Sequence, residues 1–110
     1  MPTINIFYND DELEPKLAEA TKQLKEFVAK ELTCGDIELN SDEVSVRLLK
    51  NTGSGMLAPV ELEVTAAAFK ERVEKQDEIC LSIQKFLLDK LELPDVKVWL
   101  ILSELGHSWR

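Results

Sequence analysis

The chain has 110 residues, of which 45% are hydrophobic and 31% are charged, a balance that fits one globular domain. Its net charge of -8 argues against nucleic acid and anionic membranes as partners, because phosphate binding needs clustered lysines and arginines. No apolar run approaches the roughly 20 residues of a membrane span, and no secretory leader is visible, so we expect a cytoplasmic protein with reduced cysteines. With one histidine and no Cys/His cluster, the sequence predicts no metal site and implies no cofactor.

The first half of the chain predicts a strand, a helix and a second strand. Residues 2–8 alternate with period two, which places Ile4, Ile6 and Tyr8 on one face of a strand. A helical pattern runs from Leu13 to the region of Gly35. Residues 43–50 alternate again and predict the second strand.

The second half repeats this order. Residues 59–65 predict a strand, and the helical pattern is strong from Arg72 onward, whereas residues 66–71 fit either a loop or an early helical turn. Residues 96–102 predict the last strand, which is apolar on both faces apart from Lys97. The apolar stripe expected on the second helix is Val73, Gln76, Cys80, Ile83, Leu87 and Leu91.

The two halves, residues 1–50 and 59–102, therefore predict a single α+β domain over residues 1–110. A duplicated β-α-β unit gives a four-stranded mixed sheet with two helices on one face. The other face, with Phe7, Trp99 and Ile101, would be exposed in a monomer, and we expect another subunit to cover it. A ferredoxin-like domain has the same element order and is the alternative; it would form an antiparallel sheet and a dimer.

Three places in the sequence carry a resemblance to a known family. Met1-Pro2 leads directly into an Ile/Phe strand, Lys70 and Arg72 lead into the second helix, and the tail contains Glu104 and Trp109. With the doubled β-α-β order, these features resemble the tautomerase superfamily, which includes macrophage migration inhibitory factor, 4-oxalocrotonate tautomerase and malonate semialdehyde decarboxylase. Residues 60–109 look most similar to a small bacterial branch for which no substrate is implied.

The resemblance implies a chemistry. Once Met1 is removed, Pro2 would be a secondary amine that acts as general base on a small anionic substrate, in a homotrimer. Arg72 and Lys70 would hold the substrate carboxylate. Glu104 would serve as an acid that activates water, and Trp109 as a pocket wall or an oligomer contact. The chain departs from the family pattern with a lysine at one of two arginine positions and with no cation in residues 32–35.

Other readings of the same residues stay open. The same fold also fits a non-enzymatic oligomeric binding or interaction protein, in which Pro2 only starts a strand. Arg72 could be a first-turn surface residue that pairs with Glu71 or Asp77. Arg47 is expected to pair with Glu61 or Glu63 across strands rather than to touch substrate.

Overall fold

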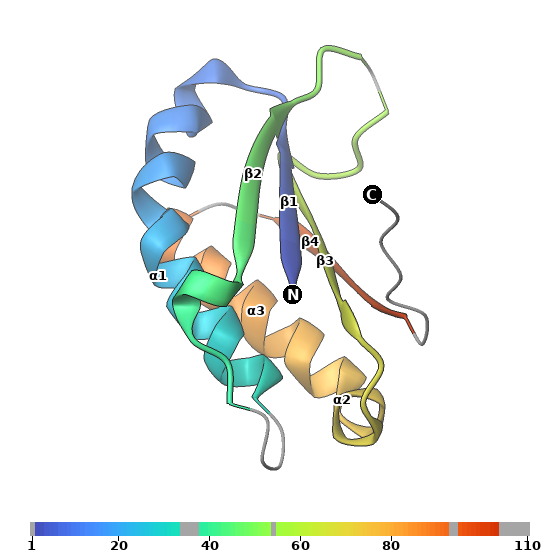
Figure 1. The fold of residues 1–110 in the computed structure, drawn as a ribbon. Helices are drawn as coiled ribbons and strands as arrows, with labels where there is room; N and C mark the ends of the chain where they lie inside the picture. The colour runs from blue at the N-terminus through green and yellow to red at the C-terminus, as the bar shows by residue number, and fades with distance from the viewer. Residues whose placement is uncertain (1, 34–37, 54, 93–94, 104–110) are drawn as a thin grey trace, which may run out of the picture.

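The computed structural model describes residues 2–33, 38–53, 55–92 and 95–103 (Figure 1). Its strands are β1 (Thr3–Tyr8), β2 (Ser45–Lys50), β3 (Val60–Ala67) and β4 (Val96–Ser103). Its α-helices are α1 (Glu14–Leu32), α2 (Lys70–Glu74) and α3 (Gln76–Leu91). Two short 3-10 turns, η1 (Asp11–Leu13) and η2 (Ser41–Glu43), precede α1 and β2.

The four strands form one sheet in the order β2-β1-β3-β4. β1 pairs in parallel with β2, and β3 pairs in parallel with β4, as two right-handed β-α-β units require. The two units meet through the antiparallel pair of β1 and β3. The mixed sheet predicted from the sequence is thereby confirmed, and the ferredoxin-like alternative, which needs an antiparallel sheet, is wrong.

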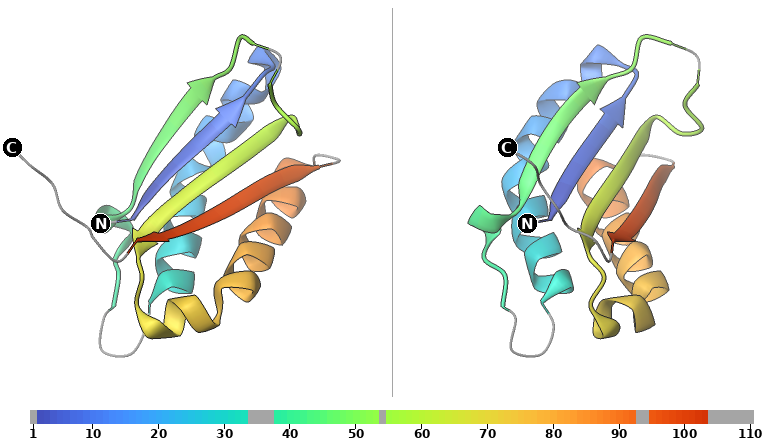
Figure 2. Two further views of the ribbon diagram at one scale, coloured as in Figure 1. Left: turned by 90° about the vertical axis from the view of Figure 1, so that its right-hand side faces the viewer. Right: turned by 45° about the vertical axis from the view of Figure 1, so that its right-hand side comes forward.

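Both long helices lie on one face of the sheet, which both views of Figure 2 show. Period-two alternation directs Ile4, Ile6 and Tyr8 toward the helices, where each is at most 4% exposed. β3 contributes Val60, Leu62 and Val64 to the same layer. The helices supply the other half of the core, with Leu17, Leu24, Val28, Leu32, Ile79, Ile83 and Leu87.

The second helical segment differs from its prediction. β3 continues to Ala67, and the helix begins at Lys70 and breaks at Lys75, whose φ of -105° and ψ of 16° are not helical. Because of the break, the buried stripe is Ile79, Ile83 and Leu87, whereas Val73 is 50% exposed. The predicted placement of Val73 on the apolar face is therefore wrong.

Two glutamines fix α3 on the sheet. Gln76 donates from its Nε2 to the carbonyl of Leu100 at 3.1 Å, and Gln84 donates to the carbonyl of Val96 at 2.8 Å. Both acceptors belong to β4, so the helix is tied to this edge strand at two places along its length.

The face of the sheet away from the helices is open in the single chain. Trp99 is 42% exposed and Ile101 is 46% exposed, and Phe7 is half-buried between its neighbours. These side chains, with Glu61 and Glu63, line a shallow hollow of 210 Å³. The expected exposure of Trp99 and Ile101 on this face is confirmed, whereas Phe7 on the same face is half-buried.

We expect the core contact of α3 to dominate stability over its outer surface. Ile83 is fully buried and Leu81, two residues away, is 50% exposed. Ile83→Ala should lower the free energy of unfolding by about 2–5 kcal/mol, through lost transfer energy and a residual cavity. Leu81→Ala should change it by less than about 0.5 kcal/mol. Denaturant unfolding at one protein concentration measures both; equal effects would contradict the placement of α3.

Candidate functional site

Pro2 lies at the start of β1, at the end of the sheet where β3 and β4 finish. The residue is buried, and its carbonyl accepts a hydrogen bond from the backbone N–H of Ser45 at 3.0 Å. The antiparallel register pairs Thr3 with Thr65, so the next position places Pro2 opposite Ala66. Pro2 is thus held between β2 and β3 rather than projecting from the molecule.

Arg72 is the buried charged side chain near this end of the sheet. Its side chain is 3% exposed although it belongs to the short helix α2. Its Nε donates to the carbonyl of Leu32 at 2.9 Å, and its Nη1 donates to the carbonyl of Ala67 at 3.0 Å. The guanidinium also lies 4.6 Å from the centre of the Phe69 ring. Arg72 therefore joins the end of α1 to the end of β3.

The position of Arg72 has a clear electrostatic cause. The carbonyl of Leu32 belongs to the last turn of α1, where carbonyls have no partner within the helix and carry the negative end of the helix dipole. A guanidinium is a planar fork that can bond two acceptors at once. The alternative reading of Arg72 as a surface residue is not what the structure shows, since the side chain is buried.

Pro2 and Arg72 come close through β3. Pro2 is opposite Ala66, and Arg72 holds the carbonyl of the next residue, Ala67. Pro2 and Arg72 therefore both flank the last two residues of β3.

The other predicted site residues are not gathered at this point. Lys70 is the first residue of α2 and its side chain is exposed. Glu104 and Trp109 lie outside the described residues, as does Met1. Of the five predicted residues, the structure brings Pro2 and Arg72 near one another and sets Lys70 on the outer surface of the same corner.

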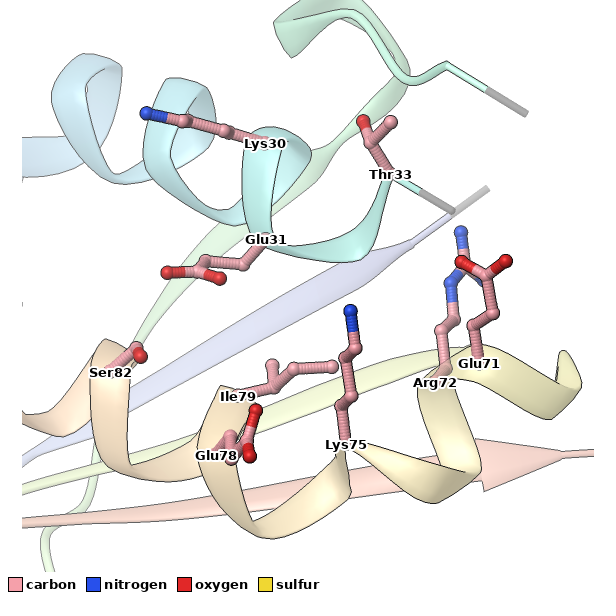
Figure 3. Close-up of a pocket in the computed structure, with 9 residues that line it drawn as sticks. All are labelled: Lys30, Glu31, Thr33, Glu71, Arg72, Lys75, Glu78, Ile79 and Ser82. Carbon is pink, nitrogen blue, oxygen red and sulfur yellow. The ribbon is translucent and has the colours of Figure 1, made fainter. Parts of the chain in front are cut away.

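A cleft of 260 Å³ adjoins Arg72 on the helix side (Figure 3). Lys30, Glu31 and Thr33 border it from the end of α1, while Arg72 and Lys75 rise toward them from the opposite wall. The remaining lining residues are Glu71, Glu78, Ile79 and Ser82. Three cations and three carboxylates line the cleft, and Pro2 is not among its lining residues, so the cleft reaches Arg72 from the side away from the strand.

Other reactive groups in the described part of the chain offer less chemistry. Burial raises the pKa of the Cys80 thiol above its usual value, so little thiolate forms at neutral pH. Across the residues described, no group of three or more His, Cys, Asp or Glu side chains could hold a metal ion. None of the described helices is both long and apolar enough to cross a membrane.

Among the residues that line the cleft, the sequence predicted Arg72 as a site residue and missed the others. Lys75 belongs to it because the helix breaks there, and the 66–74 segment gave no clear signal of that break. The sequence did contain a signal for the contact between α3 and β4. Gln76 and Gln84 are polar residues in an otherwise apolar helix, and buried polar side chains are usually hydrogen-bonded.

We expect Arg72 to be important for stability because of its two carbonyl bonds. Arg72→Met would leave both acceptors unpaired and should lower the free energy of unfolding by about 2–4 kcal/mol. Arg72→Lys keeps the charge but cannot bond both carbonyls as a fork, so its loss should be about half as large. Lys70→Met, on the exposed start of the same helix, is the control and should be nearly neutral. Denaturant unfolding of the three variants checks this order; equal losses for Arg72→Met and Lys70→Met would contradict it.

Comparisons with known proteins identify the fold. No family model matches the sequence, and no curated protein matches it significantly. Among solved structures, a macrophage migration inhibitory factor-like protein from Entamoeba histolytica is 10% identical, with a TM-score of 0.67 over 97% of this chain and 95% of that one. A symmetric trimer of fused 4-OT is 16% identical, with a TM-score of 0.68 over 92% of this chain and 85% of that one. A member of the cis-3-chloroacrylic acid dehalogenase family is also 16% identical, with a TM-score of 0.57 over 92% and 74% of the two chains. At such low identity, the likeness shows a shared fold.

Proposed function

We propose that this chain, whose fold is that of the tautomerase superfamily, is a proline-dependent tautomerase that acts on a small 2-oxo or enol carboxylate. The observation that supports the proposal is the burial of Pro2 opposite Ala66, the residue before Ala67, whose carbonyl the Arg72 guanidinium holds. A secondary amine at the end of a rigid strand and a fixed cation are the two groups that proton transfer through an enolate needs.

The chemistry requires a free amine. With Met1 removed, Pro2 is a base whose unperturbed pKa is about 7.7–8.0. Burial and the nearby Arg72 charge both disfavour the ammonium form, so we expect the pKa of the Pro2 amine to lie below that range. The amine takes a proton from the carbon next to the substrate carbonyl, which leaves an enolate, and the resulting ammonium returns the proton to another carbon of the enol system.

The cations have two parts in this scheme. Arg72 uses Nε and one Nη1 hydrogen on backbone carbonyls, which leaves its Nη2 hydrogens for a substrate carboxylate or for the developing enolate. Lys70, exposed at the start of α2, would attract the anionic substrate to this corner. Glu104 and Trp109 complete the proposed set, as an acid and as an aromatic wall.

We also propose that the protein is a cytoplasmic homotrimer. The open sheet face, with Trp99 and Ile101 each more than 40% exposed, is the surface that a neighbouring subunit would cover. Similar solved structures include fused 4-OT proteins described as symmetric and asymmetric trimers.

The role of Pro2 can be tested with two N-terminal changes. Pro2→Ala still permits removal of Met1 but replaces the rigid secondary amine, and it should slow the enolisation of an aryl-pyruvate by about 10²–10⁴-fold. An N-terminal extension that converts the Pro2 nitrogen to an amide should remove the activity. Intact-mass measurement of each preparation shows whether Met1 is absent. Full activity in a protein that keeps Met1 would overturn the proposal.

The pH dependence of the reaction tests the effect of Arg72 on Pro2. A general base is active above its pKa, so kcat/KM should rise with pH and then level off. Removing the nearby cation raises the pKa of the amine, so Arg72→Met should move this rise to higher pH. Arg72→Lys keeps a positive charge and should leave the midpoint near that of the unmodified protein. Identical midpoints in all three proteins would show that the Arg72 charge does not act on the base.

One observation favours a second candidate, a non-enzymatic oligomeric binding protein of the same fold. Arg72 already uses two donors on backbone carbonyls, and Pro2 does not line the cleft beside it. In that case, Arg72 serves stability alone. Pro2→Ala would then change neither ligand binding nor oligomeric state.

A further inference from the structure

The open face of the sheet carries unlike chemistry at its two edges. One row of residues crosses all four strands and reads Arg47 on β2, Asn5 on β1, Glu63 on β3 and Trp99 on β4. The strand order makes β2 and β4 the two edges of the sheet. The row therefore begins with a cation at one edge and ends with an aromatic ring at the other edge, and a carboxylate lies on the strand next to that ring.

Neither charge of this row finds a partner inside the described part of the chain. The ion pairs there join Lys50 to Asp11 and Lys97 to Asp95, and none includes Arg47 or Glu63. The sequence-based expectation that Arg47 pairs with Glu61 or Glu63 within the chain is wrong, because no ion pair of the described residues includes Arg47. Glu61 is occupied elsewhere, since its carboxylate accepts the N–H groups of Leu57 and Ala58.

The centre of the row is also incompletely bonded. The Oδ1 atom of Asn5 is buried and has no hydrogen-bond partner. Glu63, beside it, is half-buried between Asn5 and Trp99. A half-buried carboxylate without a cation is unfavourable, so this surface has the character of an interface seen without its second half.

We propose that the β2 edge of one copy of this chain docks against the β4 edge of the next. Arg47 then lies across the Trp99 ring of the neighbouring copy and pairs with the Glu63 carboxylate beyond it. This inference rests on the homotrimer of the proposed function and names the contact that holds it together. The contact joins two different surfaces, so successive copies follow one another head to tail, and three of them close a ring.

The geometry of the row supports this pairing. A rotation about an axis along the strands keeps each residue at its height, so Arg47 of one copy meets the level of Trp99 and Glu63 in the next. The span from β2 across β4 to β3 of the neighbour is about two strand spacings, or ~10 Å, which an arginine and a glutamate side chain bridge together. Within one chain the same span crosses Asn5, whereas between copies it crosses an indole, the aromatic surface most favourable for a guanidinium.

Apolar groups on the two edges agree with the charges. Leu49, on the same face of β2 as Arg47, is 39% exposed. Trp99 and Ile101 on β4 are 42% and 46% exposed, and they border the 210 Å³ hollow. Docking would bury all three side chains, and apolar burial supplies most of the driving force for association. The charge pair would fix which edge meets which.

Charge exchange tests the docking directly. The variants are Arg47→Glu, Glu63→Arg and both together, with Lys85→Glu, exposed on α3, as a control that changes net charge as much as Arg47→Glu does. Sedimentation over a range of protein concentrations should give a mass of about three times 12.5 kDa for the unmodified protein. Each single exchange should raise the trimer dissociation constant about tenfold or more, because it places like charges together. The double exchange should return the constant to within about threefold, and Lys85→Glu should not change it.

Each contrary result has a defined meaning. A trimer whose dissociation is unchanged by the single exchanges, or is not restored by the double exchange, overturns this docking and leaves the trimer standing. A monomeric unmodified protein overturns both the docking and the trimer, while the Pro2 assays still decide the catalytic proposal. If the single exchanges change the free energy of unfolding but not the trimer dissociation constant, Arg47 and Glu63 pair within one chain. That result would also overturn the proposed docking.

Discussion

The contact between the Arg72 guanidinium and two backbone carbonyls holds the end of α1 against the end of β3. The candidate site lies at this corner of the molecule. Leu32 ends the first helix and Ala67 ends the third strand, and 34 residues of sequence lie between them. Burying a charge costs several kcal/mol unless hydrogen bonds replace its water, and the two carbonyls do so at 2.9 and 3.0 Å. The two halves of the fold are thereby joined at the end of the sheet where Pro2 starts.

The sequence predicts the layers of this fold well because each layer follows from a local period. Alternation in residues 2–8 and 96–102 predicted β1 and β4 to within one residue at each end, and the repeated order of elements predicted the mixed sheet. The break at Lys75 was not predictable in the same way. It depends on where Arg72 can be buried and where Gln76 reaches the carbonyl of Leu100, and both are contacts between distant parts of the chain. Helical periodicity continued through the break therefore placed Val73 in the core instead of Ile79.

The candidate site was predictable only in part, because some of its features are local in the sequence and others depend on contacts between distant residues. Pro2 could be found from its position in the sequence alone, since a proline after the start methionine is a potential free amine. Arg72 was found from its place before the second helix, but its direction was not, because the residue spacing does not distinguish a first-turn side chain that points to solvent from one that turns inward. The acceptors that draw it inward are backbone carbonyls, which leave no mark in the sequence. Lys70, two residues earlier, has the same local context and stays exposed, so the burial of Arg72 is a property of the assembled corner.

The duplicated architecture also explains why the open face is asymmetric. The two β-α-β units place β1 and β3 at the centre and β2 and β4 at the edges, so each edge strand occupies an equivalent position in its own half. A face with the same residues on both edges would favour a two-fold contact of like with like. Here one edge carries Arg47 and Leu49, and the other carries Trp99 and Ile101 next to Glu63, so in the proposed docking unlike edges would attract one another. Such a difference favours a ring over a pair.

The strands that carry this face are the strands that hold Pro2, whose neighbours on β2 and β3 are fixed by the same registers. Docking of the edges would therefore hold β2 and β4 in place and, through these registers, the strand β1 that Pro2 precedes.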